Sequence, residues 1–143
     1  MSKEKIYIYT DGGSRGNPGV AGAGAIVKNE NGMTLASGHK SLGIMTNNEA
    51  EYEAVLLGLS LLKKKLGKTR LKNYDIEVRM DSELVARQLS GKYQIKESRL
   101  FPYFIKVHNA QVSDFPKLSF MHIPREKNSE ADALANDAMD TGV

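Results

Sequence analysis

The sequence predicts an α/β domain in which helices cover the faces of a β-sheet. Segments with alternating apolar and polar residues, typical of strands, are interspersed with segments that carry apolar residues at helical spacing. Their order is three strands, a helix, a strand, two helices, a strand and a final helix. Because helices separate the later strands, those strands require crossover connections and are expected to run parallel to one another.

Length and composition indicate one soluble domain. The chain has 143 residues, 41% of them hydrophobic and 26% charged, and no apolar run approaches the roughly 18 residues that cross a bilayer. The absence of cysteine excludes disulfides and thiolate metal sites, and no signal-peptide segment precedes the first strand. We therefore expect a single domain over residues 1–143, monomeric, cytoplasmic and without a membrane partner. The net charge of +3 permits a polyanionic partner without requiring one.

The first strand is predicted at Lys5–Tyr9, where the two faces alternate, and it is expected to end at Asp11. Four glycines and a proline follow within residues 12–19, so the chain should turn there with backbone amides free to meet an anion. A carboxylate beside such amides indicates phosphate chemistry through a metal ion. A plain glycine-rich hairpin turn is the alternative.

Two more strands complete an antiparallel meander. Small residues at 20–27 and the segment 33–40 alternate as strands, and the polar stretch 29–32 predicts the hairpin turn between them.

A long helix follows the meander. Thr46, Asn47 and Asn48 are candidate N-caps, and apolar residues along one broad stripe carry the helix to about Leu66. A run of lysines followed by Gly67 suits its C-terminal end.

The remaining elements follow from the same signals. Asp81 ends an alternating strand, and Ser82 can cap the helix after it. The predicted elements are a strand at 75–81, a helix at 83–90, a helix at 98–112, a strand at 118–123 and a helix at 128–139.

Acidic residues gather where these elements begin or end. Ligands of open α/β sheets bind at the carboxyl ends of strands, where Asp11 and Asp81 stand. Helix starts add Asp132 and either Glu49 or Glu51. Each acid alone can be explained as a turn residue, a helix cap or a partner of the helix dipole. Together they predict a site for a hard divalent ion such as Mg²⁺, because clustered carboxylates repel one another unless a metal neutralises them.

Ordered segments across nearly the whole chain carry a family resemblance. They are Tyr9-Thr10-Asp11-Gly12-Gly13 with Gly16-Asn17-Pro18-Gly19, Thr46-Asn47-Asn48-Glu49-Ala50-Glu51, Met80-Asp81-Ser82, and Asn128-Ser129-Glu130-Ala131-Asp132-Ala133-Leu134-Ala135. With these segments the chain resembles the type 1 ribonuclease H family. The resemblance implies the family's fold, a five-stranded mixed sheet flanked by helices.

The resemblance also implies an activity, the endonucleolytic hydrolysis of the RNA strand of RNA/DNA hybrids with 5′-phosphate products. The residues that match the family's metal-binding acids are Asp11, Glu51, Asp81 and Asp132. The match selects Glu51 over Glu49, because the family's glutamate stands three residues after the second asparagine. The implied cofactor is a pair of Mg²⁺ ions, with Mn²⁺ as the alternative, about 4 Å apart in a two-metal mechanism.

Further matching positions imply contacts with the hybrid. The family holds the minor groove at the positions of Asn17, Asn47 and Asn48 and through the backbone amides of Gly12 and Gly13. Amide side chains both donate and accept, so they can read 2′-hydroxyls and thereby select the RNA strand. Arg15 and Thr46 are candidate phosphate contacts, although turn and cap roles explain them equally well.

The chain departs from the family pattern in two places. The tryptophan-rich basic protrusion of many members is replaced by the short segment 91–98, which has no Trp and offers few cations, so substrate binding is expected to be weaker or more salt-sensitive. The family's flexible histidine loop is shortened to 122–127. We expect Arg125 to take the histidine's place, as in a shorter archaeal-like branch, with His122 as the alternative.

Other functions are compatible with parts of the pattern. A resolvase or integrase-like nuclease of the same superfold would act on DNA, but the asparagine set argues against it. A non-catalytic hybrid-binding module would be expected to lack one of the acids. A phosphate-binding protein built on the glycine segment would leave Asp81 and Asp132 unexplained.

Overall fold

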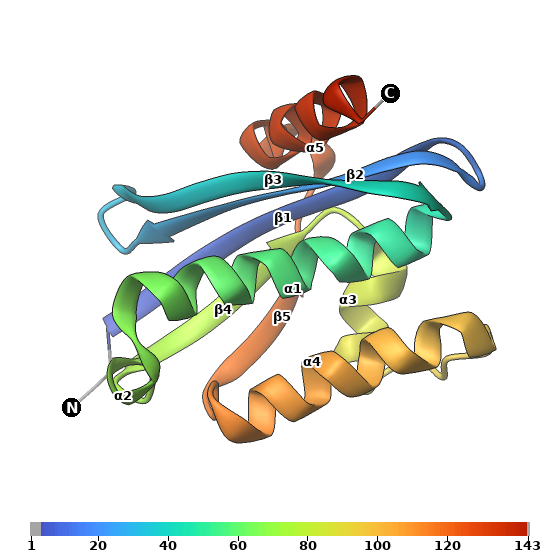
Figure 1. Ribbon diagram of the computed structural model, residues 1–143. Coiled ribbons are helices and arrows are strands. Elements are labelled where there is room, and N and C mark those ends of the chain that lie inside the picture. The colour runs from blue at the N-terminus through green and yellow to red at the C-terminus, as the bar shows by residue number, and fades with distance from the viewer. Residues whose placement is uncertain (1–3, 143) are drawn as a thin grey trace.

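The computed structural model describes residues 4–142 and contains one five-stranded sheet in the order β3-β2-β1-β4-β5 (Figure 1). The strands are β1 (Glu4–Gly16), β2 (Gly19–Asn29), β3 (Thr34–Met45), β4 (Tyr74–Met80) and β5 (Leu118–His122). The first three strands pair antiparallel, whereas β4 runs parallel to β1 and β5 parallel to β4. The predicted mixed sheet, with its meander and parallel later strands, is therefore confirmed.

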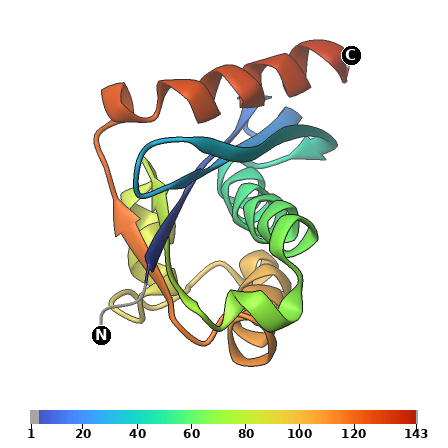
Figure 2. The ribbon, with the colours of Figure 1, turned by 90° about the vertical axis from the view of Figure 1, so that its left-hand side faces the viewer.

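Helices cover both faces of the sheet. They are α1 (Asn47–Leu66), α2 (Lys68–Leu71), α3 (Glu83–Leu89), α4 (Phe101–Ser113) and α5 (Ser129–Thr141), with short 3₁₀ turns η1 (Ser98–Leu100) and η2 (Arg125–Lys127). Helix α5 lies on one face of the sheet, and α1 lies on the other with α4 beyond it (Figures 1 and 2). The N-terminal part of the helix predicted at 98–112 is the 3₁₀ turn η1, and α2 was not predicted.

The core lies between the sheet and α1. Ile6 and Ile8 of β1 point to this side, as the alternation predicted, and pack with Ile76 and Val78 of the neighbouring strand β4. Tyr52 of α1 is fully buried, and its hydroxyl donates a 2.8 Å hydrogen bond to the side chain of Gln88 on α3. Burying so many apolar side chains on one face supplies the main driving force for this layer.

Strand β1 differs from its prediction, because it does not end at Asp11. It continues in register with β2 through the glycine-rich segment as far as the pair Gly16 and Gly19, and the chain reverses at Asn17 and Pro18. The prediction treated the glycines as turn residues. Pairing with β2 keeps this segment extended, while the parallel pairing with β4 ends at Thr10. Asp11 thus lies just past the end of the pairing with β4 and within the pairing with β2.

The boundaries of α1 are confirmed in detail. Thr46 is the N-cap and forms a capping box with Glu49, whose backbone N–H donates to the threonine hydroxyl at 3.2 Å. Gly67 ends the helix with a φ of 81°, a conformation that favours glycine. Ser82 caps α3 as predicted, because its hydroxyl accepts a hydrogen bond from the N–H of Val85.

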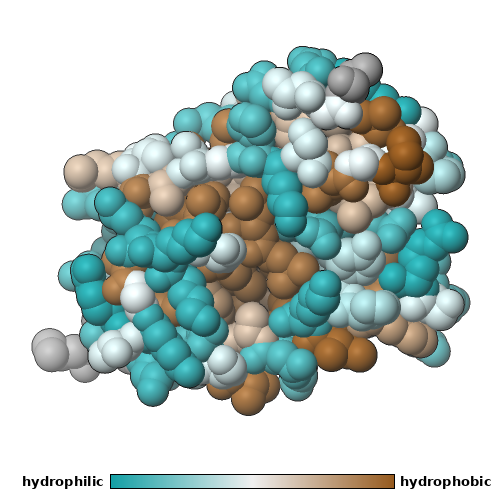
Figure 3. All heavy atoms as spheres, in the orientation of Figure 1, coloured by the Kyte–Doolittle hydropathy of each residue, from teal (hydrophilic) through white to brown (hydrophobic). Residues whose placement is uncertain are grey.

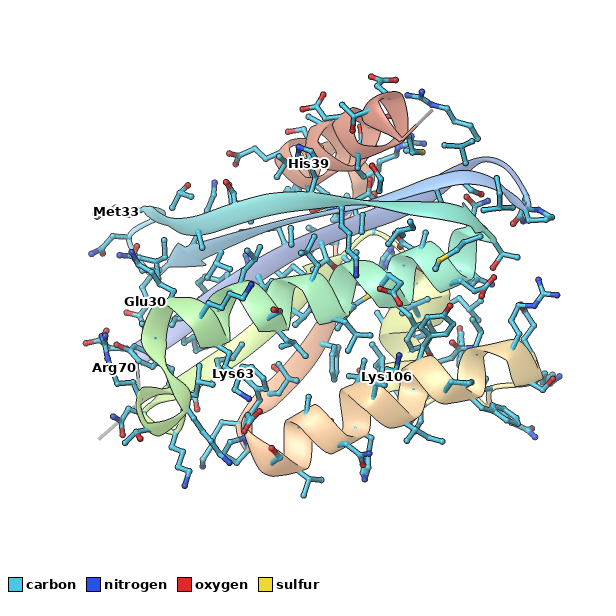
Figure 4. All side chains as sticks on the ribbon, viewed as in Figure 1. Glu30, Met33, His39, Lys63, Arg70 and Lys106 are labelled. Atoms are coloured by element: carbon cyan, nitrogen blue, oxygen red, sulfur yellow. The ribbon has the colours of Figure 1, made fainter. Side chains whose placement is uncertain are left out.

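An ion pair joins α1 to the end of α4. The carboxylate of Asp114 is buried and accepts a 2.8 Å hydrogen bond from Nζ of Lys63, which projects from α1 towards the C-terminal end of α4 (Figure 4). This hydrogen bond is the main reason that the pKa of Asp114 lies below its ordinary value.

The outer surface is mostly hydrophilic on the face seen in Figure 3, with apolar atoms exposed over the middle of α1, between β3 and α4. None of the helices formed by residues 4–142 is long and apolar enough to span a bilayer.

On the face of the sheet that packs against α5, the close approach of helix and strand requires glycine. A Cβ on Gly24 of β2 would lie 2.6 Å from the carbonyl oxygen of Ala131 and from the N atom of Ala135, both on α5. The helix backbone therefore rests directly on the strand, and a larger residue would push the two apart.

We predict that Gly24→Ala lowers the free energy of unfolding by about 1 to 3 kcal/mol, because the added methyl group overpacks the contact with α5. The matched control is Gly38→Ala on β3, where a Cβ would meet Leu61 side-chain carbons at 3.5 and 3.6 Å, an ordinary contact. Urea unfolding of both variants measures the difference. Equal stabilities would contradict close packing of α5 on Gly24.

Candidate active site

The end of the parallel pairing between β1 and β4 brings Asp11 and Asp81 together. The last parallel pair is Thr10 with Met80, so each aspartate is the next residue along the chain. Glu51, in the second turn of α1, completes a group in which one carboxylate oxygen from each residue lies within 4.8 Å of the others. Sequence positions far apart thus converge at one edge of the sheet, as the strand-end argument predicted.

Glu51 owes its position to Gly12. A Cβ on Gly12 would lie 2.1 Å from the carbonyl oxygen of Ala50, so only glycine allows α1 to approach β1 this closely. In return, the backbone N–H of Gly12 donates a hydrogen bond to Oε1 of Glu51. The glutamate is 7% exposed, and this bond fixes its carboxylate beside the carboxyl of Asp11, with which it also forms a hydrogen bond.

Asp132 approaches the same group from the opposite layer. It lies in the first turn of α5, and its carboxyl is within hydrogen-bonding reach of Asp11. The amide of Asn136, one turn later, donates to the backbone oxygen of Asp132 at 3.0 Å. Asp132 is outside the tightest group of three acids, and it forms the wall of the site on the α5 side.

Asn128 connects α5 to strand β1 beneath the acids. It is 1% exposed, and its Nδ2 donates a 2.9 Å hydrogen bond to the backbone oxygen of Thr10, the residue before Asp11. Its own backbone oxygen accepts from the N–H of Asp132 at 3.0 Å. One buried side chain therefore sets the distance between two of the acids. Sequence analysis includes Asn128 in a segment that matches the family but assigns it no role.

Burial and repulsion from neighbouring carboxylates make Asp11 and Glu51 hard to ionise without a cation. Burial, followed by the charges of Glu51 and Asp81, raises the pKa of Asp11 to about 9. Burial also raises the pKa of Glu51, although the hydrogen bond from Gly12 opposes the shift. Carboxylate oxygens at this spacing are the ligands that a hard divalent ion requires, so the residues present fit such an ion.

Glu49 has a different environment from Glu51. Its carboxylate accepts hydrogen bonds from the N–H of Thr46 at 3.1 Å and from the hydroxyl of Tyr103 at 3.0 Å. Burial is the largest single effect on the pKa of Glu49 and acts to raise it, but the hydrogen bonds from Thr46 and Tyr103 together outweigh burial, so the pKa lies below its ordinary value. Glu49 therefore serves the helix cap and the contact with α4, as the family resemblance implied when it selected Glu51.

A groove of about 500 Å³ lies over the acids. Its lining contains most of the candidate residues: Asp11, Gly12, Gly13, Arg15, Asn47, Asn48, Glu51, Asp81, Arg125 and Asp132. It also contains Ser82, predicted as a helix cap, and three residues that sequence analysis missed: Ser14, Asn136 and Met139. No local pattern marks these three, because contacts between distant elements bring them to the groove.

Two candidate substrate residues lie beside the groove rather than in its lining. Asn17 is exposed, and its Oδ1 accepts a 3.0 Å hydrogen bond from the backbone N–H of Asn47. Thr46 is engaged in the helix cap. Arg15 lines the groove but forms an ion pair with Asp140 of α5, with 2.5 Å between Nη1 and Oδ1.

Arg125 and His122 occupy distinct positions. Arg125 is exposed in the turn η2 after Pro124 and lines the groove. His122 is the last residue of β5, and its Nδ1 lies 3.9 Å from a carboxylate oxygen of Glu83, away from the groove lining. The geometry favours contact between a groove ligand and the arginine.

Comparison with known proteins gives consistent matches over nearly the whole chain. A family model described as "Reverse transcriptase-like" matches residues 9–138. A bifunctional protein of Mycobacterium tuberculosis is 42% identical over 140 residues, which are 97% of this chain and 36% of that protein. The chain therefore spans about a third of the length of its mycobacterial relatives.

Solved structures agree with the sequence comparison. A type 1 ribonuclease H isolated from compost, crystallised in complex with an RNA/DNA hybrid, has a TM-score of 0.92 and 47% identity over 96% of this chain and 98% of its own. The type 1 enzyme of Halobacterium salinarum has a TM-score of 0.84 and 36% identity over 96% of this chain and 98% of its own.

We predict that, without divalent ions, the free energy of unfolding falls as the pH rises from near 4 towards about 9. The folded-state pKa of Asp11 is above its unfolded value, so the folded state holds a proton that the unfolded chain releases over this range. Asp11→Asn should flatten this dependence and be more stable than the wild type at pH 8 by on the order of 2 kcal/mol.

Urea unfolding in EDTA at pH 5 and pH 8 tests this prediction. Repeating the pH 8 measurement with MgCl₂ provides the control, because a bound cation should stabilise the wild type and not the variant. Parallel pH dependences of the two proteins would contradict the raised pKa of Asp11.

Proposed function

The chain belongs to the ribonuclease H family, and we propose that it hydrolyses the RNA strand of RNA/DNA hybrids, leaving 5′-phosphate ends. The observation that carries the proposal is the convergence of three carboxylates at the end of the parallel strands, beside amides that can meet a phosphate backbone. The hybrid bound by the compost enzyme supports the choice of substrate.

The acids suit a two-metal mechanism with Mg²⁺, or Mn²⁺ in its place. Asp11, Glu51 and Asp81 would hold the ions, with Asp132 completing the site from α5. Ions bound there would activate the attacking water and stabilise the leaving 3′ oxygen of an in-line displacement. The fold's part is to keep the carboxylates in place through Gly12 and Asn128, and no covalent nucleophile is needed.

Amide groups around the acids would hold the hybrid. Asn47 and Asn48 line the groove and can contact 2′-hydroxyls and base edges, with Asn17 behind Asn47. Gly12 and Gly13 also line the groove; the N–H of Gly12 donates to Glu51, so a backbone contact with the hybrid is proposed at Gly13. Arg15 and Thr46, at its rim, are proposed phosphate contacts.

The proposal also covers domain extent, oligomeric state and cellular location. Residues 1–143 act as one ribonuclease H domain, as a monomer in the cytoplasm. The length is that of one ordinary domain, and the absence of cysteine is compatible with a reducing compartment. A related nuclease acting on DNA is the second candidate, since the acids alone would serve it, but the paired asparagines favour recognition of RNA.

A gel assay with hybrid, double-stranded RNA and double-stranded DNA, each with and without Mg²⁺, tests the function. We expect metal-dependent cutting of the RNA strand of the hybrid. Efficient cutting of the all-DNA duplex would favour the DNA nuclease instead.

Activity measurements on variants of the acids should distinguish metal-binding carboxylates from the carboxylate that only caps α1. Asp11→Asn, Asp81→Asn and Glu51→Gln should each lower kcat by at least about 100-fold while the fold persists, because each removes a charged ligand. Glu49→Gln is the matched control and should retain activity, since glutamine can also complete a capping box. Near-normal turnover of Asp11→Asn in Mg²⁺ would show that the site is assigned wrongly.

The roles of Arg125 and His122 can be separated by pH. Arginine stays protonated, since its pKa exceeds about 12, so Arg125 would steady the scissile phosphate or help product leave. Arg125→Ala should lower kcat about 10-fold at every pH. His122→Ala should leave the pH profile of kcat nearly unchanged. Loss of an ionisation near neutral pH in His122→Ala alone would reverse the assignment.

A further inference from the structure

Two neighbouring asparagines present opposite hydrogen-bonding groups to the groove. The Oδ1 atom of Asn47 accepts a 2.9 Å hydrogen bond from the backbone N–H of Ser14 in β1. Its carbonyl group is thereby turned towards the protein, and its Nδ2 is left to meet a ligand. Asn47 is therefore a donor at this rim of the groove.

Asn48 is held in the other orientation by Glu97. Its Nδ2 donates a 3.3 Å hydrogen bond to Oε1 of Glu97. A carboxylate accepts hydrogen bonds and donates none, so it can pair only with the NH₂ side of the asparagine amide. Within residues 4–142, no hydrogen-bond donor meets Oδ1 of Asn48, and that oxygen is free to accept from a ligand.

The position of Glu97 is set by the fold. Glu97 stands at the start of η1, where its backbone oxygen accepts a 3.0 Å hydrogen bond from the N–H of Leu100. Leu100 is fully buried in the core. The backbone of Glu97 is thus anchored although its side chain is exposed, and its carboxylate is kept beside Asn48.

The minor groove of a duplex offers many partners for the Nδ2 donor of Asn47 but few for the Oδ1 acceptor of Asn48. Every base pair offers acceptors there, at purine N3 and pyrimidine O2, whereas the amino group of guanine is the only base donor. The donor of Asn47 can therefore be satisfied at any base pair. The acceptor of Asn48 finds a base partner only at guanine.

We propose that Glu97 gives this protein a preference for guanine at the base pair that Asn48 faces, by fixing Asn48 as an acceptor. A 2′-hydroxyl both donates and accepts, so it would suit either orientation of Asn48 and would not depend on Glu97. The guanine amino group is the partner for which the orientation matters. This proposal rests on the proposed function and adds a cleavage-site preference to it.

The test uses hybrids in which guanines are replaced one at a time by inosine, in the RNA strand and in the DNA strand. Inosine still pairs with cytosine and lacks only the minor-groove amino group. We expect one position, at a constant distance from the cleaved bond, where inosine lowers kcat/KM about 5- to 10-fold, because the acceptor of Asn48 is left unpaired. Inosine elsewhere should have little effect.

Glu97→Gln should remove this discrimination. Glutamine has nearly the size of glutamate but can donate as well as accept, so Asn48 can turn and present either side. The ratio of guanine to inosine cleavage rates should fall to within about twofold of unity. The control is Glu30→Gln, which removes the same charge at the β2–β3 hairpin, at the other end of the sheet (Figure 4). That variant should keep the wild-type ratio.

Binding gives a second readout that does not require cleavage. Fluorescence anisotropy of the Asp81→Asn protein with guanine and inosine hybrids should show the same preference, and adding Glu97→Gln should remove it. If the wild type cuts no hybrid, the proposed function is refuted. The ratio of affinities for guanine and inosine hybrids would still test the role of Glu97. Hybrid cleavage with no inosine-sensitive position, or the same sensitivity in Glu97→Gln, would overturn the guanine proposal alone.

Discussion

The close approach of α1 to strand β1 at Gly12 is the contact on which the site depends. Without a Cβ at this position, the backbone of Ala50 can rest on the strand, and Glu51 reaches the N–H of Gly12. A methyl group there would overlap the helix backbone and move the glutamate away from Asp11 and Asp81. The long antiparallel pairing of β1 with β2 keeps Gly12 extended at the point of contact, so the meander is part of the site's construction.

The acids do not hold themselves together, because their charges repel one another and burial disfavours ionisation. The two layers of helices impose the arrangement. The apolar core fixes α1, and glycine contacts fix α5 against β2. Asn128 adds a buried hydrogen bond from the start of α5 to the strand that carries Asp11. The free energy that folding supplies elsewhere thus offsets a locally unfavourable cluster, as is common where a protein prepares a cation site.

Local signals in the sequence predicted much of this structure. Alternation marked the strands, and the capping residues Thr46 and Ser82 and the terminal Gly67 marked helix ends. The extent of β1 was predicted wrongly, because glycine favours turns by itself and only the partner strand β2 keeps it extended. The roles of Ser14 and Asn128 were missed for a similar reason: their hydrogen bonds join residues distant in sequence. Strand ends pointed to Asp11 and Asp81, whereas the choice of Glu51 came from the family resemblance and not from spacing.

The same distinction applies to recognition of the substrate. Sequence identifies Asn47 and Asn48 as amides, which can donate or accept, and their neighbours decide which group faces outward. A backbone N–H from β1 turns one asparagine, and a carboxylate from the segment before α4 turns the other. Neither partner touches the acids, yet together they convert two chemically identical side chains into a donor and an acceptor. The pattern that a duplex meets at this rim is therefore a property of the tertiary structure, and proteins that share the paired asparagines can differ in it through a single residue such as Glu97.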